Sequence, residues 1–401
     1  MTQPRGLTVI KGLYFFYFAA FGVFTVFINV YYHNIGLSGV QIGWINAVAP
    51  LVGIFAGPLW GYLSDRTGRP RALIAVGIVG SALGVLGISA VRTFLWLLPL
   101  AGVYQLFVAT IPPLIDTTNL ALLGEHKDRY GRQRIWGTIG YIISTLILGA
   151  VLERVGLHWL FYGYAAIMLV MLGVAAFMPA RAVHRESSER GDLRALIRQP
   201  EWLFFAASLI PLWICSNGMY AFLGVYMKEM GASAGLIGMS SSINAMAEAP
   251  MMLFSSFLVR RLGLKRMLGL AYGLYAVRFL LYGLMPSPEW ALAIGLMHGV
   301  TFGMFWVSAV VYMSELAPPS LRTTNQTLLW ALMNFAGVIG SPVSGWIFDH
   351  IGPAQLFRLY ALLALLALAV LLVGFANSRK RAEGQPAAPE IILPPDRNEL
   401  L

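Results

Sequence analysis

Twelve apolar stretches, each close to the length that a bilayer requires, constrain this chain more than any other feature. Crossing the hydrocarbon takes about 20 apolar residues in a helix. The stretches lie near residues 12–33, 42–63, 72–91, 95–122, 135–153, 159–178, 203–227, 235–258, 266–285, 290–314, 324–347 and 355–376. Backbone polar groups in lipid must be satisfied within the segment, so we expect helices, and the alternation of period two typical of membrane strands does not occur. The sequence predicts an all-α membrane protein with twelve transmembrane helices.

The positions of the charged residues support this prediction and give it an orientation. Only 11% of the 401 residues are charged, too few to cover a water-soluble fold. If the N-terminus is cytoplasmic, 23 of the 28 lysines and arginines fall in loops or helix ends on that side. This asymmetry is the positive-inside rule. We therefore predict a multi-pass protein of the cell inner membrane with both termini cytoplasmic. The net charge of +10 is then explained by the basic residues of the cytoplasmic loops, and no nucleic-acid partner is expected.

One long polar segment separates the apolar stretches into two sets of six. The expected organisation is an N-terminal six-helix bundle at 1–178, a cytoplasmic linker at 179–202, a C-terminal six-helix bundle at 203–376 and a cytoplasmic tail at 377–401. The tail is polar and rich in proline, which predicts disorder.

The two halves also share short repeats. Residues 149–156 (Gly-Ala-Val-Leu-Glu-Arg-Val-Gly) match residues 345–352 (Gly-Trp-Ile-Phe-Asp-His-Ile-Gly) at an offset of 196, with both glycines and the acid in register. Residues 61–71 match residues 256–266 more weakly at an offset of 195, and Arg260 stands at the position of an aspartate. Internal repeats of this kind mark transporters whose substrate site lies between the halves, near the bilayer midplane.

The segment 61–71 forms a charged turn between the second and third expected helices. Gly61 would let the helix end approach a neighbour closely, and Gly68 would supply a sharp bend. Asp65 can accept N–H groups from a nearby helix N-terminus or pair with an arginine. A contact of this kind can form in one conformation and break in another, which makes Asp65 a candidate conformational latch. The alternative is a solvated loop acid.

Five residues of this turn, Gly61, Asp65, Arg66, Gly68 and Arg69, resemble the loop signature of the major facilitator superfamily. The turn departs from that signature at position 70, where a proline precedes the next basic residue. The resemblance implies two pseudo-symmetric six-helix bundles that transport a solute by alternating access.

Four charged residues fall inside or at the edge of apolar stretches, where each charge is costly and needs a reason. At about 1.5 Å of rise per residue, Glu248 and Arg278 lie at similar depth, as do Asp116 and Arg134. The sequence thus predicts one acid–base pair in each half. Either these pairs only neutralise each other and hold helices together, or they line a water-filled cavity. In the second case Glu248 would exchange the proton.

Polar and aromatic residues recur at helical spacing in four of the stretches, and each stripe alone is typical of packing. Together they predict an aromatic cavity with a few hydrogen-bonding groups. The members are Asn29 with Thr25, then Trp213, Asn217 and Tyr220, then His298, Phe302, Phe305 and Trp306, and last Trp330 with Asn334. His298 is a second titratable candidate for proton coupling, or else a hydrogen-bonding core residue.

The segment Tyr130-Gly-Arg-Gln-Arg-Ile-Trp-Gly-Thr-Ile-Gly-Tyr141 resembles the helix 4–5 region of proton symporters of the lactose permease type. That group includes phenylpropionate-permease-like and nucleoside-permease-like carriers. The resemblance implies that Asp116 and Arg134 bind substrate hydroxyls, that Tyr141 stacks on the substrate, and that Arg278 adjoins the proton site. Glu248 falls about one turn after the corresponding acid of lactose permease, and the helix-10 acid has no evident equivalent.

The function predicted from these features is proton-coupled symport of a small polar organic solute, a sugar or a nucleoside. The expected partners are the solute, protons and the lipid bilayer. We expect a monomer with no cofactor and no metal. Export of an amphipathic or aromatic compound and a non-transporting receptor on the same fold are the alternatives. An enzyme is not expected, because the sequence has no nucleophile–base constellation, metal-ligand spacing or phosphate-binding glycine loop.

Overall fold

The computed structural model describes residues 3–124, 126, 129–178, 196–318 and 321–384, and in these ranges every regular element is helical. The helices are α1 (Gln3–Asn34), α2 (Gly39–Thr67), α3 (Pro70–Ser89), α4 (Phe94–Val108), α5 (Ile111–Leu123), α6 (Tyr130–Val155), α7 (Trp159–Ala175), α9 (Pro200–Glu229), α10 (Ala234–Leu262), α11 (Leu264–Leu284), α12 (Trp290–Gly295), the π-helical turn η2 (Gly299–Gly303), α13 (Met304–Leu316), α14 (Arg322–Ile351) and α15 (Pro353–Gly384).

Two crossings are built from more than one helix. A break at residues 109–110 separates α4 from α5, which begins Ile111-Pro-Pro, and prolines cannot donate the backbone bonds that would continue α4. The crossing at 290–316 contains α12, η2 and α13. Within the described ranges, ten stretches are long and apolar enough to cross a membrane, Trp159–Ala175 is a shorter apolar helix, and α10 is 29 residues long. These helices cover all twelve predicted stretches, so the fold class is confirmed.

Two helices extend beyond the predicted segment ends. The helix α15 continues through residues 377–384, which we expected to be disordered. The helix α9 begins at Pro200, within the predicted linker, because a proline at the first position of a helix loses no intrahelical bond. Residues 179–195 of the linker and 385–401 of the tail lie outside the described ranges.

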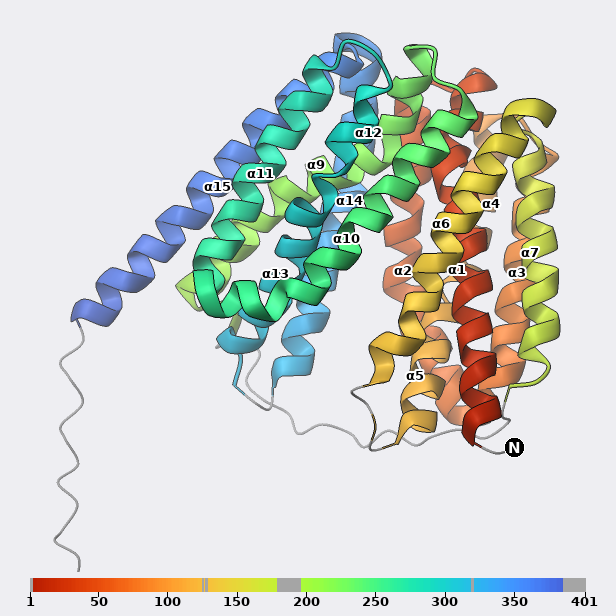
Figure 1. The fold of residues 1–401 in the computed structure, drawn as a ribbon, viewed down its shortest axis with the longest axis horizontal. Coiled ribbons are helices and arrows are strands. Elements are labelled where there is room, and N and C mark those ends of the chain that lie inside the picture. Colours follow the sequence, from red (N-terminus) through yellow and green to blue (C-terminus); the bar gives the residue numbers. More distant parts are fainter. Residues whose placement is uncertain (1–2, 125, 127–128, 179–195, 319–320, 385–401) are drawn as a thin grey trace, which may run out of the picture.

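Two groups of helices meet at one end of the molecule and diverge toward the other (Figure 1). In one group α1 packs on α6 and α7, and α3 packs on α4 and α7. In the other α15 packs on α9 and α11, and α9 also packs on α14. The groups are joined mainly by α2 against α14 and by α6 against α10. We call the joined end, where α2 begins and α14 finishes, the closed end. The opposite end, which carries Arg66, Arg69 and Arg261, is the basic end.

Glycines along α2 show how far this junction extends. A Cβ added at Gly39 would lie 2.7 Å from the carboxylate of Asp349 on α14, and one at Gly43 would overlap the carbonyl of Ser341. A Cβ at Gly57 or Gly61 would meet nothing within 4 Å. The predicted close approach at Gly61 is therefore wrong in this conformation, because α2 and α14 have separated before reaching that position.

Substituting a glycine at the junction should cost stability. In Gly345→Ala the new Cβ overlaps the carbonyl oxygen of Gly39, and such overpacking costs about 1–3 kcal/mol. We expect the thermal unfolding temperature of the purified protein to fall. Gly57→Ala is the matched control, since it adds a methyl group to open space and raises helix propensity. Equal unfolding temperatures for the two variants would contradict the packing described here.

Candidate functional site

Asp116 on α5 is held by tyrosine hydroxyls. The hydroxyl of Tyr14 on α1 donates a short hydrogen bond to its carboxylate, and the hydroxyl of Tyr130 on α6 donates another at 3.0 Å. Asn119 in turn donates to the Tyr14 oxygen at 3.4 Å. Three helices therefore fix the carboxylate in place with neutral donors.

Arg134 on α6 does not form the predicted ion pair with Asp116. Its guanidinium lies 3.8 Å above the ring of Phe18 and 5.7 Å from the ring of Tyr14, and it has no carboxylate within 4.0 Å among the described residues. The prediction is wrong because two phenol hydroxyls already satisfy the acid, while the arginine is stabilised by cation–π contacts instead. Arg134 is partly exposed, and no hydrogen bond to its guanidinium is found among the described residues, so its N–H donors suit a ligand.

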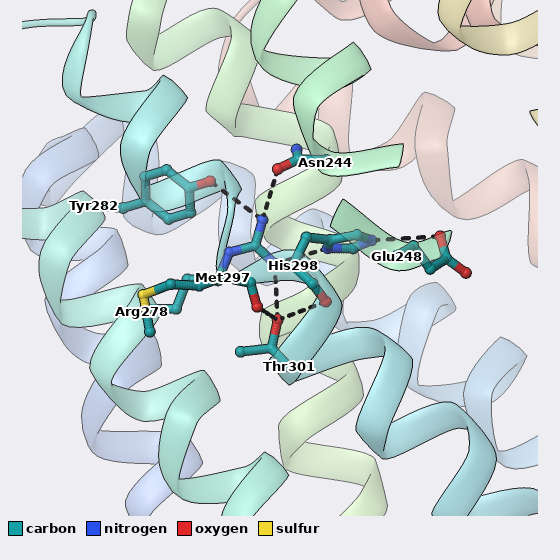
Figure 2. Close-up of polar contacts among 7 residues, drawn as sticks. All are labelled: Asn244, Glu248, Arg278, Tyr282, Met297, His298 and Thr301. Carbon is teal, nitrogen blue, oxygen red and sulfur yellow. Dashed lines mark hydrogen bonds and ion pairs between the residues drawn. The ribbon is translucent and has the colours of Figure 1, made fainter. Parts of the chain in front are cut away.

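Arg278 on α11 is completely buried, and neutral acceptors surround its guanidinium (Figure 2). One terminal nitrogen bonds His298 Nδ1 at 2.8 Å and Thr301 Oγ1 at 3.2 Å. The other donates to Asn244 Oδ1 at 3.1 Å and Tyr282 Oη at 3.2 Å. Thr301 belongs to the π-turn η2, and π-turns inside helices often mark functional sites.

These bonds assign the tautomer of His298. An arginine can only donate, so Nδ1 must accept and the ring proton must be on Nε2. Nε2 lies 4.0 Å from Glu248 Oε2 (Figure 2). The predicted direct pair of Glu248 with Arg278 is therefore wrong, because the imidazole stands between them. Glu248 is the outermost member of the chain Arg278–His298–Glu248, and its side chain is 25% exposed.

Three aromatic rings continue from His298 in a row. The imidazole stacks on Phe302 with ring centroids 5.1 Å apart, and Phe302 stacks on Trp306 at 5.9 Å. The ring of Trp330 on α14 meets Trp306 edge-on at 5.0 Å. The predicted stripe also included Phe305, but Phe305 packs on Trp213, Tyr272 and Tyr275, and Trp330 joins the row from a different helix.

A cavity of about 620 Å³ opens at the basic end of this row. Its lining residues are Trp306, Val310, Val311, Ser314, Glu315, Gln326 and Trp330. Of these, the sequence singled out only the two tryptophans. Nothing in the spacing of Ser314 or Gln326 distinguished them from solvated residues.

The remaining predicted residues differ in their exposure and in the side chains that they contact. Tyr220 is 51% exposed, and its ring lies 6.2 Å from that of His298. Tyr141 on α6 contacts Ser241 on α10, so it reaches the other half. Trp213 is partly buried against Phe305, at 5.4 Å.

Three predicted asparagines are less well placed to bind a solute. Asn217 donates to the carbonyl of its own helix at Trp213, and Asn334 is partly buried on α14. Asn29 is buried, and its amide nitrogen donates to the carbonyl of Ala221 at 3.1 Å. Its amide oxygen accepts a hydrogen bond from Asn46 at 2.9 Å. The amide of Asn29 therefore joins α1 to α9 and is already occupied.

The charged turn has the expected bend. Gly68 ends α2 with φ at +61°, the left-handed region that glycine adopts without strain, and Arg66 donates to Tyr62 at 3.1 Å. Arg69 is exposed at the start of α3. The side chain of Asp65 lies outside the described residues, so its latch role stays a prediction.

Several site residues were missed by the sequence analysis. Tyr14 and Phe18 lie one turn apart on α1 and form the platform for Arg134. Asn244 lies one turn before Glu248 on α10, and this i, i+4 spacing was the available signal. Tyr130 was inside a quoted motif, but no role followed from it.

Similarity to known proteins agrees with this architecture. The profile of the MFS_1 like family matches residues 7–359. The chain therefore belongs to this family of major facilitator transporters.

The maltose permease of Geobacillus stearothermophilus is 28% identical over 94% of this chain and 96% of its own length. The probable 3-phenylpropionic acid transporter of Escherichia coli K12 is 26% identical over 84% of this chain and 90% of its own. The crystal structure of the nucleoside transporter NupG superposes with a TM-score of 0.81 at 18% identity, covering 94% of this chain and 99% of that one. This structural likeness shows the shared fold.

Removing the Tyr14 hydroxyl should destabilise the first half of the molecule. Tyr14→Phe withdraws a donor from a partly buried carboxylate, and such losses cost about 1–3 kcal/mol. We expect a clear fall in the thermal unfolding temperature. Tyr62→Phe removes an exposed hydroxyl that accepts a hydrogen bond from the exposed Arg66, and should have little effect. Similar falls for both variants would contradict the role of Tyr14.

Proposed function

We propose that this major facilitator is a proton-coupled symporter of a small polar organic solute, a sugar or a nucleoside, working by alternating access. One observation carries the proposal. Arg134 on α6 and Glu248 on α10 belong to helices that pack on each other across the two halves, and both residues are only partly buried, so an acid and a base from opposite halves line the same interface. Neither belongs to a closed ion pair within its own half, so a solute and a proton can both compete for them.

We propose that the basic end faces the cytoplasm. The excess of lysine and arginine at that end supports this orientation through the positive-inside rule. The conformation is then one that is closed to the outside and open to the cytoplasm. We retain 1–178 and 203–376 as the two bundles, with the start of the second moved to Pro200.

The solute would lie between Arg134 and the aromatic row. The free N–H donors of Arg134 suit hydroxyl or carbonyl oxygens, and Asp116 adds acceptor lone pairs nearby. Aromatic faces of Trp213, His298 and Trp306 suit a sugar ring or a planar base. A few polar groups among apolar walls is the usual composition of a ligand site.

Glu248 would carry the proton. Intramembrane carboxylates that face a cavity are the usual proton relays of transporters. The Nε2–H of His298 points toward the carboxyl group of Glu248, 4.0 Å away, and Arg278 fixes that tautomer. His298 then acts as a positioning residue, because its Nδ1 is occupied by Arg278 and is not free to take the proton.

The named solutes of the relatives support the coarse class of substrate. They are maltose, 3-phenylpropionic acid and nucleosides, all small organic molecules with polar groups. We further propose that Gly61, Asp65, Arg66, Gly68 and Arg69 act as a latch when the basic end closes.

Neutralising Glu248 should uncouple transport. We expect Glu248→Gln to abolish accumulation driven by a pH gradient in proteoliposomes while solute exchange continues, since the amide takes no proton. The solute for this assay comes from a thermal-shift screen of maltose, uridine and 3-phenylpropionate against purified protein. Glu289→Gln, in an exposed loop at the closed end, is the control. Undiminished uphill accumulation by Glu248→Gln would refute the assignment.

Arg134 should distinguish the polar-solute proposal from export of an aromatic compound, which the aromatic row favours. Arg134→Lys keeps the charge but loses the planar donor group on Phe18, so we expect binding of the screened solute to weaken at least about tenfold. Binding is measured by equilibrium dialysis. A loss confined to Trp213→Ala, with Arg134→Lys unaffected, would favour the export function. Binding without any flux would identify a receptor.

A further inference from the structure

The closed end is built from a duplicated set of residues. The start of α2, Ser-Gly-Val-Gln-Ile-Gly at 38–43, matches the start of α10, Ser-Ala-Gly-Leu-Ile-Gly at 233–238, at an offset of 195. The acids Glu153 and Asp349 belong to the repeat near the ends of α6 and α14, at an offset of 196. The proposed symport function makes no use of either repeat.

The start of α2 has two backbone donors that its own cap does not satisfy. Ser38 accepts from the N–H of Gln41 at 3.2 Å, and the Gln41 side chain accepts from the N–H of Ser38 at 3.0 Å. A serine cap reaches the third residue of a helix and leaves the first two donors free. Those two, on Gly39 and Val40, donate to the carboxylate of Asp349 at 2.6 and 2.9 Å.

The start of α10 repeats this arrangement. Ser233 accepts from the N–H of Leu236 at 3.2 Å. The N–H of Gly235, which this cap does not bond, donates to Glu153 at 3.2 Å. In both cases the helix belongs to one half of the molecule and the acid to the other. The two contacts are therefore related by the same pseudo-symmetry as the halves.

Glycines allow the backbones to come this close. An added Cβ at Gly43 would overlap the carbonyl of Ser341, and one at the equivalent Gly238 would overlap the carbonyl of Thr145. The acids therefore sit at the end of two tight helix–helix contacts, α2 with α14 and α6 with α10.

We propose that Asp349 and Glu153 form a two-sided lock that holds the closed end shut. Each carboxylate binds the positive end of a helix from the opposite half through charge-assisted hydrogen bonds. When the halves separate at this end, the hydrogen bonds to both exposed carboxylates break and the N–H groups bond water instead, while the serine caps stay intact. The lock thus acts on the conformational equilibrium and takes no part in solute or proton binding. On the topology proposed above it is the external gate.

Spin-label distances across the closed end test this proposal without requiring a substrate or a membrane orientation. Cys215 is the only cysteine, so Cys215→Ala gives a clean background. Labels at Arg92→Cys and Glu289→Cys report on the two halves from exposed loop positions that make neither contact of the lock. We expect one short distance in the otherwise unchanged protein. Asp349→Ala and Glu153→Ala should each raise the ratio of separated to closed molecules about tenfold. The double variant should raise it further.

Near-isosteric variants keep the test independent of misfolding. Asp349→Asn and Glu153→Gln remove the charge with little change in shape and should give smaller shifts in the same direction. His350→Ala and Arg154→Gln change exposed neighbours of the two acids, and we expect no shift, since the imidazole of His350 bonds its own helix at Trp346. Unchanged distances in folded Asp349→Ala and Glu153→Ala would overturn the lock. A response at Asp349 alone would overturn its two-sided character.

Discussion

A backbone amide inside a bilayer has no water to bond, and this one constraint governs most of the structure. It makes each of the twelve apolar stretches helical. It also explains where irregular backbone occurs. The break before α5 coincides with two adjacent prolines, and the π-turn η2 brings Thr301 to the guanidinium of Arg278. At the closed end, helix starts that lie between the halves receive their missing acceptors from Asp349 and Glu153.

A second constraint follows from the buried charge of Arg278. An arginine stays protonated in proteins, so its partners must all accept. This fixes the orientation of His298 and aims the Nε2 proton at Glu248. The permanent charge thus sets the orientation of the imidazole, whose Nε2 lies 4.0 Å from the partly exposed carboxyl group of Glu248. The N-terminal half uses the opposite arrangement, in which a carboxylate is held by phenol hydroxyls and the arginine is left on an aromatic platform.

The sequence was sufficient for the fold but not for the contacts of the site. The apolar stretches predicted every helical crossing, because hydrophobic length is a local property. Counting residues along each helix predicted which charged residues lie at the same depth in the membrane. Both ion pairs predicted from this depth, Asp116 with Arg134 and Glu248 with Arg278, were nevertheless wrong. Depth does not specify which side of a helix faces which neighbour, and the donor to Asp116 comes from Tyr14, distant in the sequence. The row of His298, Phe302 and Trp306 was located correctly, since its spacing is again local.

The repeats carried more information than their weak similarity suggested. At the closed end both copies keep an acid, a serine cap and a glycine, and both copies make the contact. In the turn at 61–71 the aspartate is present once, and Arg260 replaces it in the second copy. A lock made of two equivalent contacts loses both when the halves part, whereas a latch on one side depends on a single acid. On the proposed lock and the predicted latch, the closed end would be held by more contacts than the basic end, and this inequality would favour the conformation that is shut at the closed end.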